Sequence, residues 1–163
     1  MTLRAAELTM GRTFAVHFDH GDDFYAALAE FCAEHDVRQG FIPMFIAGMR
    51  DVQLVGTCDK LENPDAPVWS SVHLENVEAV GGGTLAYDEE TGSVLPHIHV
   101  SVGLKAQSAV AHTSHLLGAK IQFLTEMYVV EVSGPTFSRQ RDPGLYDVPL
   151  LSFGSAWTDR PAP

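Results

Sequence analysis

Two histidines separated by a single residue, His97 and His99, are the side chains of this sequence best suited to chemistry. Residues two apart in a β-strand project from the same face, so a strand through this segment places both imidazoles side by side. Two imidazoles do not complete a tetrahedral metal site, and a third ligand must come from elsewhere. Three imidazoles with a fourth position open to water are typical of zinc sites that activate water or polarise a carbonyl.

Two further histidines, His112 and His115, follow a short distance downstream and are both candidates for the third ligand. Four of the eight histidines therefore lie within residues 97–115. This density favours a divalent metal, with zinc as the expected ion. The alternatives are a solvated strand face or a hydrogen-bonded histidine cluster without metal. The other four histidines are interpreted as structural or surface residues: His17, His20, His35 and His73.

Two carboxylates upstream, Glu75 and Glu78, are candidate catalytic acids or bases if they turn toward the histidines. The alternative is a solvated strand face. The three glycines at 81–83 come next, and they open a strand rather than a helix, so they lack the context of a phosphate-binding loop. We expect a bulge or tight turn there.

The elements that must position these residues are mostly strands. Alternating apolar residues predict strands at 12–18, 52–58, 68–80, 84–87, 95–102 and 126–132. A short apolar run at 41–47 predicts a buried strand that Pro43 confines to a sheet edge or a bulge, and that Gly48 ends. A turn is expected at 88–92, and a loop at 61–67.

One amphipathic helix of about three turns is expected after the turn and N-cap residues at 19–23, with Phe24, Leu28 and Phe31 on its apolar face. A weaker helical or turn segment is expected at 109–117. The pattern predicts an α+β fold with a mainly antiparallel sheet and one or two flanking helices. Residues 1–10 are interpreted as a lead-in, 11–153 as the single domain and 154–163 as a flexible tail.

Composition narrows the classes of function. Lysine and arginine number 10 against 21 aspartates and glutamates, a formal net charge of -11. Such a chain repels the DNA polyanion on average, so direct DNA binding is not expected. No secretory leader and no membrane-spanning run is recognised, which favours a cytoplasmic location. The two cysteines, Cys32 and Cys58, are too few for a disulfide framework and are expected to be reduced.

Several of these motifs together resemble the plants and prokaryotes conserved (PPC, or PCC) domain. The similarity runs from about Gly11 to Leu145. It is carried by Gly21-Asp22-Asp23, Gly48-Met49-Arg50-Asp51-Val52, the Gly82-Gly83-Thr84 segment, His97-Ile98-His99-Val100-Ser101, Ser114-His115-Leu116-Leu117-Gly118 and Phe137-Ser138-Arg139. The family's histidines fall on His97, His99 and His115, with Thr113-Ser114 in place of two family glycines.

The resemblance implies a homotrimer built around an antiparallel sheet. Plant members join the domain to DNA-binding AT-hooks, and stand-alone prokaryotic relatives are labelled as DNA-binding candidates on that basis. This sequence has no AT-hook core. The fold is also similar to that of acetolactate decarboxylase, a zinc enzyme that holds its metal through a His-x-His pair and a later histidine.

Three functions follow from these observations. The leading one is a stand-alone PPC-domain protein that trimerises and binds a divalent metal, with His112 near the three family histidines. The second is a metal-dependent lyase or hydrolase acting on a small carbonyl-containing metabolite. The third is a DNA-associated regulator that acts through protein partners.

Overall fold

Alternation of buried and exposed side chains gives most of this chain the conformation of a β-strand. The computed structural model describes residues 5–56, 70–88, 90–107, 110–145 and 148–154. Its elements are β1 (Thr9–Asp19), α1 (Phe24–Glu34), β2 (Gly40–Val55), β3 (Ser71–Asp88), β4 (Ser93–Leu104), β5 (Ala111–Gly134), β6 (Phe137–Asp142), a 3-10 turn (Pro143–Leu145) and β7 (Val148–Phe153). The mainly antiparallel α+β prediction is confirmed, with one α-helix among the described residues.

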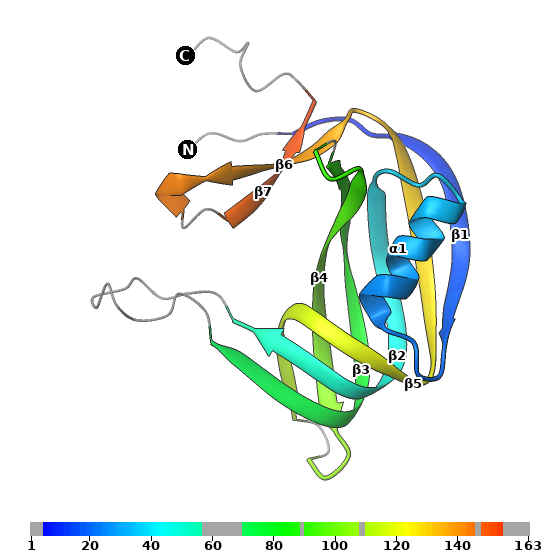
Figure 1. The fold of residues 1–163 in the computed structure, drawn as a ribbon, viewed down its shortest axis with the longest axis vertical. Coiled ribbons are helices and arrows are strands. Elements are labelled where there is room, and N and C mark those ends of the chain that lie inside the picture. Colours follow the sequence, from blue (N-terminus) through cyan, green and yellow to red (C-terminus); the bar gives the residue numbers. More distant parts are fainter. Residues whose placement is uncertain (1–4, 57–69, 89, 108–109, 146–147, 155–163) are drawn as a thin grey trace.

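The main sheet has the strand order β1-β5-β2-β3-β4, and β4 also pairs with β5. This additional pairing curls the sheet into a small barrel-like shape (Figure 1). Every pairing is antiparallel. The strand β5 is long enough to pair with β1, β2 and β4, and its first residues are the ones that pair with β4.

The helix α1 forms as expected. Its N-cap residue, Asp23, accepts hydrogen bonds from the backbone N–H groups of Tyr25 and Ala26, which satisfies two free helix donors. The apolar face of the helix is buried against the sheet: Phe24, Leu28, Phe31 and Cys32. Tyr25 donates its hydroxyl to the carbonyl of Leu116 at 2.6 Å, which attaches the helix to β5.

The strand β2 differs from the prediction in two ways. It is a central strand between β5 and β3, and it continues through Gly48 to Val55. Pro43 is accommodated by a bulge, since the register with both neighbours shifts between residues 41 and 45. The bulge alternative was therefore correct, whereas the sheet-edge alternative and the break at Gly48 were wrong. Gly48 lies close to the carbonyl of Gln122, where a β-carbon would not fit.

The glycines at 81–83 form no tight turn, so that alternative was wrong. They lie inside β3, and each pairs with a β4 residue without a register shift. The bulge alternative holds on the β2 side, where the register shifts between the Ile42–Gly83 and Phe45–Gly81 pairs. The expected turn at 88–92 does form, and Gly92 has a positive φ of 67° and donates its N–H to the Asp88 carbonyl. The predicted loop at 61–67, Cys58, and residues 155–163 of the predicted tail lie outside the described residues.

The segment at 111–117, expected to be helical or a turn, is instead the beginning of β5. This correction matters for the site, because a strand and a helix project the same side chains in different directions. Beyond β5, the hairpin of β6 and β7 stands apart from the main sheet in Figure 1. Its Phe137 packs with Val132 and Ala86 in a second, smaller apolar cluster that fixes β6 against the end of β3.

No helix in the described part of the chain combines the length and the apolar character that crossing a membrane requires.

Candidate metal centre

The strand β4 presents its histidines on the face opposite to the core. Ile98, Val100 and Val102 are fully buried, so the alternation turns His97 and His99 outward on the other face. This is the arrangement that the His-x-His spacing predicts.

The third histidine comes from β5. His115 is the direct cross-strand partner of His99, because the first residues of β5 pair with the end of β4. Directly paired residues on neighbouring antiparallel strands project from the same face of the sheet. The sheet topology therefore brings together two histidines, His99 and His115, that are 16 residues apart in the sequence.

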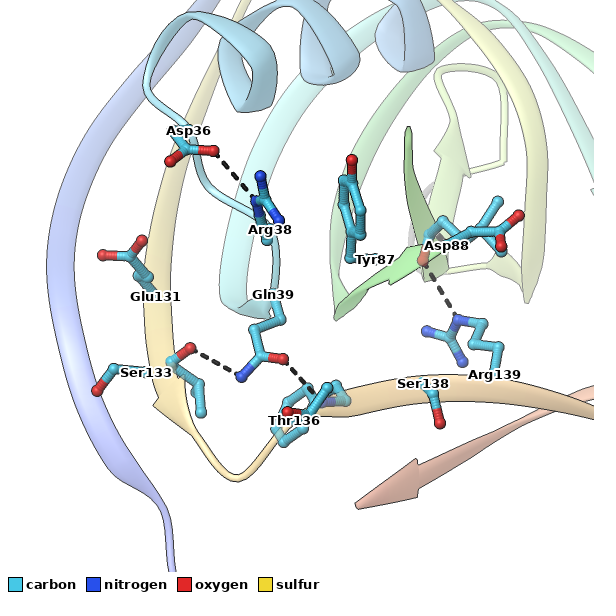
Figure 2. Close-up of a pocket in the computed structure, with 13 residues that line it drawn as sticks. Asp36, Arg38, Gln39, Tyr87, Asp88, Glu131, Ser133, Thr136, Ser138 and Arg139 are labelled. Carbon is cyan, nitrogen blue, oxygen red and sulfur yellow. Dashed lines mark hydrogen bonds and ion pairs between the residues drawn. The ribbon is translucent and has the colours of Figure 1, made fainter. Parts of the chain in front are cut away.

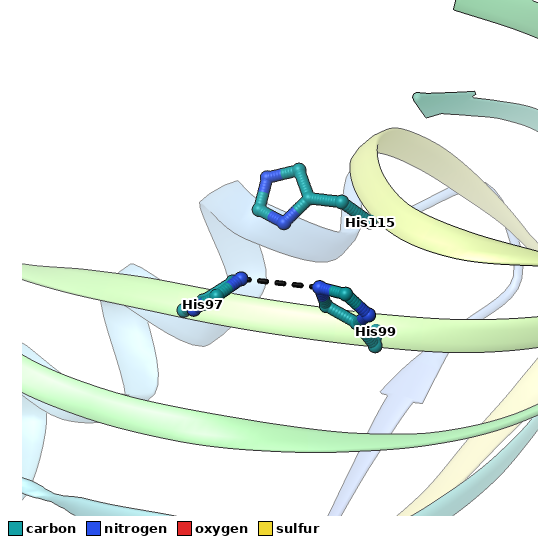
Figure 3. A group of neighbouring side chains, drawn as sticks. All are labelled: His97, His99 and His115. Carbon is teal, nitrogen blue, oxygen red and sulfur yellow. Dashed lines mark hydrogen bonds between the residues drawn. The ribbon is translucent and has the colours of Figure 1, made fainter. Parts of the chain in front are cut away.

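The three imidazoles converge on one point (Figure 3). One ring nitrogen of each lies within 4.8 Å of the others, and the Nε2 atoms of His97 and His99 are 3.1 Å apart. Ring centroids are separated by 4.9, 5.0 and 5.5 Å. Three nitrogens bound to a tetrahedral zinc ion at about 2.0–2.1 Å would lie roughly 3.3 Å from one another. We call His97, His99 and His115 the three-histidine site.

Electrostatics keep this site in the form that binds metal. Burial, followed by the charge of Arg139 and the neighbouring imidazoles, lowers the pKa of His97 to about 4. Burial also lowers the pKa of His115, again with contributions from His99 and Arg139. Both rings are therefore neutral at pH 7, and a neutral imidazole offers the lone pair that a metal ligand needs. The donor set fits zinc.

Two glycines of β3 allow β4 to lie where the site requires it. A β-carbon on Gly81 would be 2.6 Å from the carbonyl oxygen of His99, and one on Gly83 would be closer still to the carbonyl oxygen of His97. Real β-carbons do not approach backbone oxygens so closely, so the two strands could not pair at this distance with alanine at either position. The glycine run has a structural role in holding the site's strand.

His112, proposed from the sequence as an alternative ligand, does not belong to the three-histidine site. It pairs with Val102 on β4, three positions from His115 along β5. In a helix or turn, residues three apart share a face, but in a strand they project from opposite faces. The strand conformation of this segment therefore separates His112 from His115.

The structure does not bring Glu75 and Glu78 to the histidines. Gly82 is the β3 residue that pairs with His99, and the two glutamates lie seven and four residues from it along the strand. At about 3.3 Å per residue these separations are roughly 23 and 13 Å. Within one chain, neither carboxylate can exchange a proton directly with a ligand at the three-histidine site.

Glu75 instead lies in a second group with Asp51 and His73, whose ligand atoms are also within 4.8 Å of one another. Asp51 is opposite Glu75 in the β2–β3 pairing, and its carboxylate is 3.7 Å from His73 Nε2. The Arg50 guanidinium contacts the other Asp51 oxygen at 3.1 Å. Asp51 is half-buried and the other three side chains are exposed, so this group lies at the surface of the sheet.

Sequence analysis missed one residue beside the site, Arg139. It lies on β6, and it reaches β3 and β4 through hydrogen bonds to the carbonyl and hydroxyl of Thr84 and to the carbonyl of Leu95. Thr84 is the cross-strand partner of His97. Only the motif Phe137-Ser138-Arg139 signalled this residue, and no local pattern showed that β6 would cross the sheet next to His97.

A cavity of about 560 Å³ includes Arg139 in its wall and lies between β6, the ends of β3 and β5 and the segment before β2 (Figure 2). Its wall is polar and carries a second cation, Arg38, whose guanidinium lies 4.8 Å above the ring of Tyr87. Gln39 closes one side, since it donates to the carbonyls of Val132 and Pro135. The cavity is large enough for a small organic molecule.

The fold is a small barrel-like antiparallel sheet with three histidines on adjacent strands, and a sequence comparison identifies the family to which the chain belongs. The sequence pattern of the Plants and Prokaryotes Conserved (PCC) domain matches residues 5–133, so the chain belongs to the PCC domain family. The family resemblance drawn from the sequence is confirmed. A comparison with curated protein sequences gives no match.

Solved structures share the fold. A metal-containing protein from Archaeoglobus fulgidus aligns with a TM-score of 0.76 and 22% identity, over 92% of this chain and 99% of that one. A candidate DNA-binding protein from Bacteroides thetaiotaomicron gives a TM-score of 0.70 and 23% identity, over 90% and 97% of the two chains. Acetolactate decarboxylase from Bacillus subtilis gives 0.50 and 15%, over 78% of this chain and 54% of that enzyme.

Proposed function

We propose that this PCC-domain protein binds a divalent metal ion, zinc by preference, through the three-histidine site. The observation that carries the proposal is the convergence of three ring nitrogens within 4.8 Å on two adjacent strands. The lowered pKa values of His97 and His115 support it, because protons then compete weakly with the metal at pH 7. The description of the Archaeoglobus fulgidus relative as metal-containing agrees with it.

The test is metal analysis of the purified full chain and of three single variants, His97→Ala, His99→Ala and His115→Ala. Zinc should be present at about one ion per chain in the wild type and lost from each variant after dialysis. His112→Ala is the matched control, because it removes an imidazole from the same strand on the opposite face. Equal zinc in the site variants and the wild type would refute the proposal, and so would zinc loss confined to His112→Ala.

A catalytic role on a small carbonyl compound is the second candidate, favoured by the number of ligands. Three protein ligands leave one tetrahedral position open, which is the arrangement of catalytic zinc sites, whereas structural sites have four. A zinc ion bound in this way polarises carbonyl oxygens and lowers the pKa of coordinated water. The chain's own part is to hold three imidazoles in place and to supply a cation beside them.

Exchange at the open position can be tested with cobalt. Azide added to the Co²⁺-loaded protein should change its visible absorption bands, because the fourth position accepts an external ligand. An unchanged spectrum at high azide concentration would mean a closed site and would exclude this candidate. The third candidate is a DNA-associated regulator that acts through protein partners, and the description of the Bacteroides thetaiotaomicron relative agrees with it. The net charge of -11 disfavours direct contact with a duplex, so such a role would depend on a partner protein.

We also propose that the chain forms the homotrimer that the family resemblance implies. Apolar side chains gather on the outer face of the sheet, where Met44 pairs with Tyr128 and Ile46 pairs with Val80. These four side chains are 39–51% exposed, which is unusual for a contiguous apolar group on a monomer. Their burial in a neighbouring subunit would remove this cost.

Light scattering coupled to size-exclusion chromatography measures the assembly. The wild type should elute at three times the chain mass, and Ile46→Glu should shift it toward the monomer. Leu150→Glu places the same charge at an exposed apolar residue on β7, and should leave the mass unchanged. A wild-type monomer would refute this part. The cytoplasmic location and the domain boundaries at 11 and 153 remain predictions, to be measured by cell fractionation and limited proteolysis.

A further inference from the structure

Arg139 is a cation held in a defined position next to the three-histidine site. Its Nη2 donates to the Thr84 hydroxyl at 2.7 Å and to the Thr84 carbonyl at 3.2 Å, and its Nε donates to the Leu95 carbonyl at 3.2 Å. Leu95 is two residues from His97 on the same face of β4, and Thr84 pairs with His97 on β3. The guanidinium is therefore fixed against the same face of the sheet as the histidines.

The charge of Arg139 is not matched by the protein around it. All the hydrogen-bond partners found for it among the described residues are neutral oxygens, and no described carboxylate forms an ion pair with it. Its Nη1 is buried and has no partner within the same part of the chain. A half-buried cation without a counter-charge is unfavourable, and a free guanidinium N–H is suited to receive an anion.

Other described basic side chains have carboxylate partners. Arg12 pairs with Glu131, Arg38 with Asp36 and Arg50 with Asp51. Arg139 is the contrasting case, and it is bonded to Thr84, the residue that pairs with His97. Burial lowers its pKa, yet a guanidinium remains a cation at neutral pH.

The spacing limits the size of an anion that could reach both groups. Paired strands lie about 5 Å apart, and Arg139 is bonded to the residue that pairs with His97. A ligand that contacts both the guanidinium and a metal on the histidines needs only a few bonds between its two polar ends. The cavity that includes Arg139 in its wall provides room for the remainder of such a molecule (Figure 2).

We propose that Arg139 anchors the carboxylate of a small organic acid whose second oxygen, a hydroxyl or carbonyl oxygen on a neighbouring carbon, faces the metal at the three-histidine site. This inference rests on the proposed function and names its ligand class, a hydroxy or keto acid. Arg139 binds the ligand in this scheme, whereas the histidines bind the metal. Nη1 is the guanidinium nitrogen that the other hydrogen bonds leave free, and its N–H groups can donate charge-assisted hydrogen bonds to a carboxylate.

The test measures the binding of three small probes to the full chain by isothermal titration calorimetry. Glycolate carries both a carboxylate and a hydroxyl, acetate lacks the hydroxyl, and glycolamide lacks the charge. The zinc-loaded wild type should bind glycolate more tightly than either of the other two. Arg139→Gln should keep its zinc and bind glycolate about 10- to 100-fold more weakly, the range expected for a hydrogen bond to a charged group.

Two matched variants separate the anchor from its structural effects. Thr84→Val removes one of the hydrogen bonds that hold Arg139 but keeps the cation, and should retain most of the glycolate affinity. Arg50→Gln removes an exposed positive charge elsewhere and should bind glycolate like the wild type. If Arg139→Gln does not fold, Arg139→Lys keeps the charge without the planar fork, and should bind glycolate more weakly than the wild type does.

Each result identifies which idea fails. If Arg139→Gln binds glycolate as tightly as the wild type while both hold zinc, the anchor is refuted and the proposed function stands. Equal binding of glycolate and glycolamide by the wild type would also refute it. If the wild type holds no zinc, the proposed function fails. The anchor is then tested by acetate binding to the metal-free protein, and it is wrong too if Arg139→Gln binds acetate as tightly as the wild type does.

Discussion

Gly83→Ala tests whether the close approach of β3 to β4 is what positions the three-histidine site. The new β-carbon would lie 2.7 Å from Ile98 Cδ1 and closer still to the carbonyl oxygen of His97. The Ile98 side chain is fully buried, and the carbonyl belongs to a strand paired along its length, so neither can move freely. The substitution therefore forces the strands apart at the residue that carries the first histidine.

The expected cost follows from overpacking a filled interior, about 1–3 kcal/mol. For a chain of 163 residues each kcal/mol lowers Tm by about 2–4 °C, so a decrease of roughly 2–12 °C is expected. The displaced backbone also moves the His97 ring, and zinc affinity should fall by about 10-fold or more. Urea denaturation of the metal-free protein measures the first effect, and competition with a zinc-binding dye measures the second.

Gly103→Ala is the matched control, because it adds the same methyl group to β4 where the nearest atom is 3.9 Å away. Its stability should lie within about 1 kcal/mol of the wild type, and its zinc affinity should not change. The reasoning is refuted if Gly83→Ala is as stable as Gly103→Ala, or if it is destabilised yet binds zinc with wild-type affinity.

Three further substitutions test the surrounding structure. Glu131→Gln removes the partner of Arg12, whose hydrogen bond lowers the pKa of the Glu131 carboxyl. A carboxyl pKa that is lower in the folded state than in the unfolded state stabilises the protein at pH values above both. The variant should therefore have a lower Tm at pH 7, and the difference should disappear as the pH falls through the lowered pKa of Glu131. Thermal unfolding across this range measures it, and a difference that grows toward acid would contradict it. Gln39→Leu should lower the free energy of unfolding, measured by urea denaturation, by about 1–3 kcal/mol. The Gln39 amide links β5 to β6, because it donates to the Val132 carbonyl and accepts from the Phe137 N–H; an unchanged free energy would exclude that role. Asp23→Ala should lose about 1 kcal/mol of unfolding free energy with its N-cap, whereas Asp23→Ser should retain most of it.

Local patterns were sufficient for α1, for parts of β1 to β5 and for two of the three histidines. The alternation around His97 and His99 predicts a strand with both rings on one face, because side chains in a strand alternate whatever lies next to it. The capping residue Asp23 and the apolar spacing after it predict α1 for a similar local reason. The motifs that resemble the PCC domain were also present in the sequence itself, and the match over residues 5–133 bears them out.

The third histidine of the site could be identified only from the tertiary structure. His112 and His115 are equivalent by composition, and only the register of β5 against β4 decides that His115 faces His99. The same register removes Glu75 and Glu78 from the site, since it fixes how far along β3 they lie from Gly82. Pairing between distant segments is set by the packing of the whole sheet, which no short window of sequence contains.

Arg139 also shows the difference between what the sequence predicts and what the tertiary structure determines. In the sequence it is one of two nearby arginines beside an aspartate, and nothing in its neighbours marks it as different from other surface charges. Its position beside His97 depends on the course of β6 over β3 and β4, and on a small apolar cluster that fixes this hairpin. The sequence by itself determined which residue types were available and which strand faces carried them. Only the tertiary structure decided which of them meet, because the meeting depends on contacts between residues far apart in the chain.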